Sequence, residues 1–180
     1  MFICKHPLPT DWEQRLQESL MKRDYKKRPS RIYVCSPCRE RTWQEIWRNM
    51  MAARFYMYLI WQQTGYIARA PHGYMAMLFD DCDQRERMDA LGAGTTLLRH
   101  SDALYVCGDR ISTGMRHEII YAGRCKKPII VFNKKIFKEV GECLTGVYGA
   151  KKRLTLVSEE QFHLLELGSK ELFGEVSEDA

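Results

Sequence analysis

The stretch Ser112-Thr-Gly-Met-Arg-His-Glu118 has the residue types and the order of a ligand-binding corner. It follows the apolar run 103–107, which predicts a buried strand, and it opens a segment with helical spacing. Small residues at a helix start let a ligand approach the free backbone N–H groups, which bind anions. A carboxylate placed there would lie at the carboxyl edge of a parallel sheet, where α/β folds bind ligands. Glu118 is therefore the first candidate for chemistry.

The rest of the chain alternates strand-like and helix-like segments. The expected strands are residues 31–35, 66–70, 103–107, 128–132 and 153–157. The expected helices are 11–23, 43–63, 84–99, 112–123, 134–142 and one beginning at 158–161. This alternation predicts a parallel sheet with helices on both faces, and for 180 residues it indicates an α/β flavodoxin-like three-layer sandwich with a five-stranded parallel sheet. We expect a helical extension with a basic linker over 1–30 and the α/β domain over 31–180.

Three loops should meet at one crevice in such a fold, because they follow the first three strands. These loops are residues 36–39, 71–74 and 108–112.

Composition indicates a globular protein and excludes several classes. Hydrophobic residues make up 45% of the chain, but polar residues such as Arg54 interrupt the longest apolar run, so no membrane span is expected. The N-terminus lacks the long apolar core of a signal peptide, which predicts a cytoplasmic protein.

The seven cysteines suit reduced, buried thiols. Cys35-Ser-Pro-Cys38 has redox-pair spacing, but Cys35 ends a strand and should face the core; no metal or cofactor is expected.

The net charge of +5 is unevenly distributed. Cations cluster at residues 22–31, and the last twenty residues or so are acidic. A basic cluster can bind nucleic acid, but no nucleic-acid motif accompanies it here. Lys and Arg are also favourable at a helix C-terminus. We therefore expect a solvated helix end and linker, and nucleic acid is not an expected partner.

Three pieces of sequence resemble the nucleoside 2-deoxyribosyltransferase superfamily, which includes 2'-deoxynucleoside 5'-monophosphate N-glycosidases and uncharacterised bacterial and phage branches. The first is the strand Tyr33-Val-Cys-Ser-Pro-Cys-Arg39, and the second is Ser101-Asp102 before the third strand. The third is Ser112-x-Gly114-x-x-x-Glu118. The resemblance covers about residues 31–132.

The resemblance implies specific roles in cleaving an N-glycosidic bond. Glu118 would be the nucleophile, Tyr33 would orient it, and Ser112 would bind a 5'-phosphate. The family usually has an acidic residue eight positions before Asp102, which assists the leaving base, and this chain has Gly94 there. The proton donor must then come from elsewhere, with Asp89, Asp81, Asp80 and His72 as candidates, and Asp81 is our choice. The remaining substrate-binding candidates are Ser36, Arg39, His72, Gly108, Gly114 and Met115.

Two functions and a weaker third stay open at this point. The first is a nucleoside or nucleotide N-glycosidase or deoxyribosyltransferase, and the second is a non-catalytic sensor of a nucleotide or an ADP-ribose-like ligand. The weaker third is a nucleic-acid accessory protein that uses the basic cluster at residues 22–31. The acidic run Asp80, Asp81 and Asp83 could hold a cation, although surface acids of this kind are more often solvated helix caps. Aromatic and Met residues spread around too much of the 43–63 helix for one sheet-facing stripe, which predicts a homodimer interface.

Overall fold

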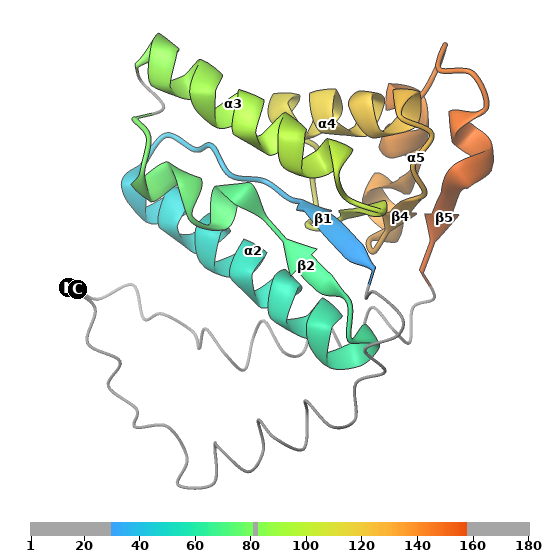
Figure 1. The fold of residues 1–180 in the computed structure, drawn as a ribbon, viewed down its shortest axis with the longest axis horizontal. Helices are drawn as coiled ribbons and strands as arrows, with labels where there is room; N and C mark the ends of the chain where they lie inside the picture. Colours follow the sequence, from blue (N-terminus) through green and yellow to red (C-terminus); the bar gives the residue numbers. More distant parts are fainter. Residues whose placement is uncertain (1–29, 81–82, 158–180) are drawn as a thin grey trace, which may run out of the picture.

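A five-stranded parallel sheet forms the centre of the computed structural model, which describes residues 30–80 and 83–157. Its strands are β1 (Arg31–Cys35), β2 (Ile67–Arg69), β3 (Ala103–Val106), β4 (Ile129–Val131) and β5 (Leu154–Leu156). They lie in the order β2-β1-β3-β4-β5 (Figure 1). The predicted α/β flavodoxin-like sandwich is confirmed. The helices expected at 11–23 and after 158, and the linker up to Pro29, lie outside the described residues.

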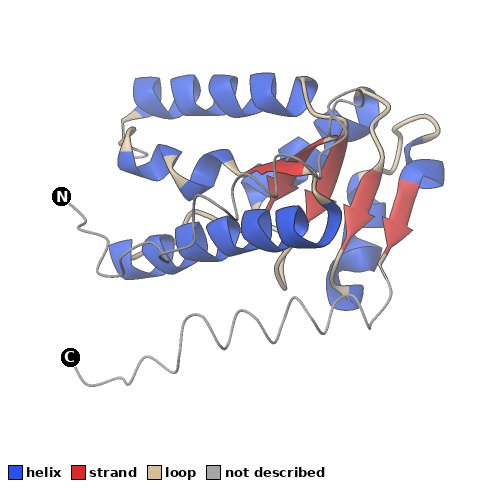
Figure 2. Cartoon of the chain, turned by 60° about the horizontal axis from the view of Figure 1, so that its bottom comes forward, coloured by secondary structure: helices blue, strands red, loops and turns tan. Residues whose placement is uncertain are grey.

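Helices cover both faces of the sheet, as expected. They are α2 (Trp43–Thr64), α3 (Gln84–Arg99), α4 (Thr113–Arg124) and α5 (Lys134–Cys143). The segments α3, α4 and α5 pack on one face, and α2 packs on the other (Figures 1 and 2). The loop expected at 71–74 contains a short 3-10 turn, η1 (Pro71–Gly73), and a second one, η2 (Met75–Met77), follows it. A third turn, η3 (Ala150–Arg153), precedes β5.

Alternation along β1 decides which side chains reach the candidate site. Tyr33 and Cys35 point to the face covered by α3, α4 and α5, whereas Ile32 and Val34 point to the face covered by α2. Side chains two residues apart share a face because a strand has a period of two.

Capping residues mark the starts of the two helices nearest the crevice. Thr42 is the N-cap of α2 and forms a capping box with Glu45, while Gly65, at φ 67°, ends the helix. Ser112 is the N-cap of α4, and its side chain accepts a hydrogen bond from the backbone N–H of Met115. These signals were present in the sequence, and the predicted helix ends agree to within a residue or two.

The strand order reverses between β1 and β3, because the chain moves outward from β1 to β2 and then crosses back to β3. The loops after these two strands lie at the carboxyl edge of the sheet, where folds of this class bind ligands. None of the helices in the described ranges combines the length and apolar composition needed to cross a bilayer.

Candidate functional site

Glu118 and Tyr33 lie next to each other on the face of the sheet that α3, α4 and α5 cover. The Tyr33 hydroxyl donates a hydrogen bond of 2.6 Å to Oε1 of Glu118, although the two residues lie 85 positions apart. The Tyr33 side chain is 1% exposed, so its ring is fixed by the core on the α3–α5 face. A short bond from a fixed hydroxyl orients the carboxyl group of Glu118. The sequence-based pairing of these two side chains is therefore what the fold produces.

Cys35 is a second neighbour of Glu118 that the sequence reading missed. Its side chain is fully buried, its thiol donates to the carbonyl oxygen of Met115 over 4.0 Å, and its presence lowers the pKa of Glu118. Because Cys35 follows Tyr33 by two residues on β1, it lies on the same face of the sheet. That spacing was the available signal, and it predicted only that Cys35 faces the core.

Burial controls the protonation of this cluster. It raises the pKa of Glu118, whereas the hydrogen bond from Tyr33 and the nearby Cys35 thiol lower that pKa. The pKa of Tyr33 lies well above its usual value, because of burial and then the negative charge of Glu118. We expected the helix N-terminus to favour the Glu118 anion. Glu118 is, however, the sixth residue of α4, and the effect of the helix dipole fades beyond the first turn.

Gly94 of α3 lies directly against this pair. A Cβ atom built on Gly94 would lie 3.3 Å from the Tyr33 hydroxyl oxygen, and the glycine itself is buried. The position at which the resemblance leads us to expect an acid therefore faces the Tyr33–Glu118 pair, but it carries no side chain. This glycine lets α3 approach the hydroxyl closely and removes a local proton donor.

Ser36 and His72 form a second pair, at the ends of β1 and β2. Oγ of Ser36 and Nε2 of His72 are 2.7 Å apart. Burial lowers the pKa of His72 to about 4, so the imidazole is neutral at neutral pH. A neutral imidazole is a poor proton donor, which weighs against His72 as the general acid. Arg54 of α2 fixes the His72 turn, because its Nε donates to the carbonyl oxygen of Gly73 over 2.7 Å.

The loops after β1 and β3 are fastened to each other. Gly108 has φ 98°, and a Cβ there would lie 2.8 Å from Cδ of Pro37, so both its backbone conformation and the close packing require glycine. The side-chain amide of Asn133 donates to the carbonyl oxygen of Gly108 over 3.1 Å. Arg110 and Glu40 add an ion pair between the same loops. Gly108 thus shapes the crevice through its backbone.

The candidates for phosphate binding lie around the start of α4 and on the β1 loop. Ser112 caps α4, and its hydroxyl hydrogen is still able to donate to a ligand. Gly114 is exposed in the first turn, and Arg39 is exposed on the loop after β1. Met115 corrects our expectation in part: its side chain is 2% exposed in the core, so only its backbone can face a ligand. Asp81, our choice of proton donor, lies outside the described residues.

Comparison with protein families identifies the domain that carries this site. A family model described as "Domain of unknown function (DUF7768)" matches residues 30–132. The chain belongs to this family. The match spans β1 to β4 and includes the Tyr33–Glu118 and Ser36–His72 pairs. Comparison with curated proteins finds no matching sequence.

The DUF7768 domain of this chain brings together two side-chain pairs, Tyr33 with Glu118 and Ser36 with His72. Within residues 30–80 and 83–157, no three His, Cys, Asp or Glu side chains are grouped to hold a metal ion. Cys35 faces the core, as expected, and burial raises the pKa of its thiol well above the usual value, whereas reactive cysteines need the opposite shift. The candidate reactive group that remains is the half-buried carboxylate of Glu118, which Tyr33 orients.

Proposed function

We propose that this protein cleaves or exchanges the N-glycosidic bond of a nucleoside or nucleoside 5'-monophosphate. The observation that supports this most directly is the 2.6 Å hydrogen bond between Tyr33 and Glu118 at the carboxyl edge of the sheet. An oriented carboxylate is the group that a glycosyl-transfer mechanism of this kind requires. The resemblance of the three sequence pieces to the nucleoside 2-deoxyribosyltransferase superfamily points to the same chemistry.

In this mechanism Glu118 attacks the anomeric carbon of the sugar. The bond to the base breaks, its electron pair leaves with the base, and a glycosyl ester forms on Glu118. Water or a second base then attacks the same carbon and releases the carboxylate. Tyr33 keeps the carboxylate aimed at the sugar through its hydrogen bond. The half-buried position of Glu118 excludes part of the water that would otherwise shield the developing positive charge.

A second function, a non-catalytic sensor of a nucleotide or an ADP-ribose-like ligand, is favoured by Gly94. The departing base needs a proton, and the position that faces Tyr33 and Glu118 cannot provide one. A domain that only binds its ligand would not need a proton donor there.

A 5'-phosphate would lie at the start of α4. Ser112 offers a hydroxyl and Arg39 an exposed guanidinium on the facing loop. Hydrogen bonds to charged groups contribute about 1.5–3 kcal/mol each, so Arg39→Gln should weaken binding of a nucleoside monophosphate roughly tenfold or more. The unphosphorylated nucleoside should lose little. Calorimetry that gives equal affinities for nucleoside and monophosphate would contradict this part of the proposal.

Release of free base from a panel of deoxynucleosides and their monophosphates tests the proposal. We expect the wild-type protein to release base, and Glu118→Ala to bind the same compound without releasing base. Glu139→Ala is the matched control, since Glu139 is an exposed carboxylate on α5 that pairs with Arg116. Binding without base release by the wild-type protein would favour the sensor. An alanine variant with near-normal turnover would eliminate Glu118 as the nucleophile.

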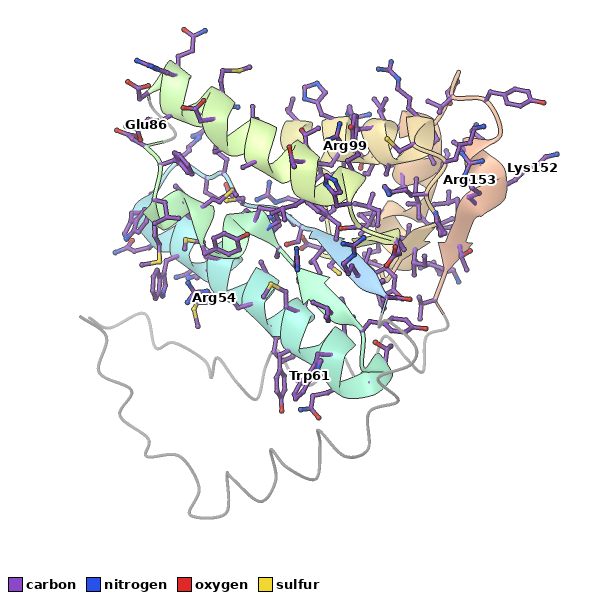
Figure 3. All side chains as sticks on the ribbon, viewed as in Figure 1. Arg54, Trp61, Glu86, Arg99, Lys152 and Arg153 are labelled. Carbon is purple, nitrogen blue, oxygen red and sulfur yellow. The ribbon has the colours of Figure 1, made fainter. Side chains whose placement is uncertain are left out.

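We also propose that the chain forms a homodimer through α2. Trp43 and Tyr58 are 56% and 52% exposed, and helical spacing puts them on the same side of α2. Figure 3 shows Trp61 pointing away from the sheet on the same helix. Exposed aromatic side chains at this density are typical of interfaces.

We also propose the cytoplasm as the compartment of this protein. The free thiols of Cys35, Cys107, Cys125 and Cys143 suit a reducing environment.

A further inference from the structure

Cations from three separate segments gather at the amino-terminal edge of the sheet. We call this surface the basic edge. Its residues are Arg99 at the end of α3, Arg124 and Lys126 at the end of α4, and Lys151, Lys152 and Arg153 in η3. All are exposed except Arg153, which is half-buried. The basic edge lies at the opposite end of α4 from the start that Ser112 caps.

Specific contacts bring these segments together. The Arg153 guanidinium donates to the carbonyl oxygen of Gly123 over 3.0 Å. A Cβ on Gly123 would lie 2.8 Å from a methyl group of Leu144 and 3.2 Å from Cβ of Ala150, so this glycine lets residues 144–150 pack on the end of α4. The Lys127 ammonium donates to the carbonyl oxygen of Ser101, which connects the segment after α4 to the segment after α3. Figure 3 shows Lys152 and Arg153 side by side on η3.

The charge of the basic edge is not neutralised within the described part of the chain. No carboxylate of residues 30–80 or 83–157 forms an ion pair with Arg99, Arg124, Lys126, Lys151 or Lys152. A cation at a helix C-terminus is favourable by itself, which accounts for Arg99 and Arg124 singly. It does not account for three consecutive cations in η3 beside them. A surface of this kind attracts a polyanion.

Tyr148 projects from the same edge. Its side chain is 99% exposed, which is far more than an aromatic ring normally is. Gly146, at φ 83°, and Gly149, at φ 65°, form the turn that carries it. A Cβ on Gly149 would lie 3.4 Å from Nη1 of Arg153, so the turn lies next to the guanidinium. An exposed ring beside cations is the combination that single-stranded nucleic acids use, with bases stacked on the ring and phosphates on the cations.

We propose that the basic edge binds single-stranded nucleic acid, with Tyr148 stacking on a base. Duplexes do not offer unstacked bases to such a ring, and polyanions without bases gain nothing from it. The cations are spread over three segments, so the linear sequence shows no compact basic motif at this surface. The proposal does not rest on the activity of Glu118.

Fluorescence anisotropy with a labelled single-stranded oligonucleotide of about 16 nucleotides tests the proposal on the full chain. With about five phosphates neutralised, affinity should fall about 100-fold between about 50 and 200 mM salt. Lys151→Gln with Lys152→Gln should weaken binding and reduce the logarithmic salt slope by about 1.4. Tyr148→Ala should weaken binding about fivefold or more without changing that slope. The matched control is Arg48→Gln with Lys135→Gln, which removes two exposed cations elsewhere and should have little effect.

Several results would overturn the proposal. One is the absence of binding at about 50 mM salt. Another is an equal loss of affinity in the control pair and the η3 pair, which would mean that only net charge matters. If heparin binds tightly and Tyr148→Ala leaves the affinity for the oligonucleotide unchanged, the surface binds polyanions in general. If a duplex binds as tightly as the single strand, stacking of a base on Tyr148 is excluded. Base release should be normal in all these variants, so a failure here leaves the proposed function untouched.

Discussion

Removing the Tyr33 hydroxyl should raise the pKa of Glu118. Tyr33→Phe keeps the buried ring and deletes only the donor of the 2.6 Å bond to Oε1. A hydrogen bond to a charged group contributes about 1.5–3 kcal/mol, and one pKa unit corresponds to about 1.36 kcal/mol. Loss of the bond should therefore shift the pKa of Glu118 upward by about one to two units. Burial already raises this pKa, so the shift would move toward neutral pH.

Carbon NMR of protein labelled at its glutamate carboxyl groups measures this shift directly, with Glu118→Gln to assign the signal. If the protein releases base, the acid limb of its pH–rate profile should move upward by the same amount, because Glu118 must be ionised to attack. Tyr105→Phe on β3 is the control, since Tyr105 packs on Phe132 on the other face of the sheet. An unchanged Glu118 signal in Tyr33→Phe would refute the reasoning about the bond. A shifted signal with an unchanged rate profile would refute only the catalytic role.

Three further predictions concern stability and assembly. The pKa of His72 is about 4 in the folded protein and 6.5 in the unfolded chain. The neutral imidazole therefore contributes fully to the free energy of unfolding above pH 6.5, and this contribution is lost as the pH falls toward 4. Urea titrations over this pH range should show that His72→Gln removes up to about 3 kcal/mol of the change in the free energy of unfolding. The same change in the wild-type protein and in His72→Gln would argue against a buried imidazole. Gly108→Ala should cost about 2 kcal/mol or more, from its positive φ and contact with Pro37, whereas Gly92→Ala, which has open space in α3, should be neutral or stabilising. Light scattering at micromolar concentration should give at least twice 21.2 kDa, and Tyr58→Glu should halve that mass; a wild-type monomer would eliminate the α2 interface.

Local signals in the sequence were sufficient for the helices and strands near the site. Thr42 with Glu45, Ser112 and Gly65 act within a few residues of themselves, so capping chemistry marks helix ends without tertiary information. The alternation of apolar segments likewise predicted the parallel sheet, because crossover connections between parallel strands must be right-handed and long. The short strands β2, β4 and β5 were each predicted one residue too long at both ends, because ladder pairing with neighbours sets those limits.

The sequence by itself determined the topology, and with it the edge of the sheet at which Glu118 and Tyr33 lie. Only the tertiary structure decided how close they come, and that Cys35 and Gly94 touch the same cluster, because these contacts join strand and helix segments far apart in the chain. The protonation of Glu118 and His72 was also decided there, since desolvation depends on what the rest of the chain packs around each group. The basic edge has the same origin: packing at Gly123 gathers cations that the sequence disperses.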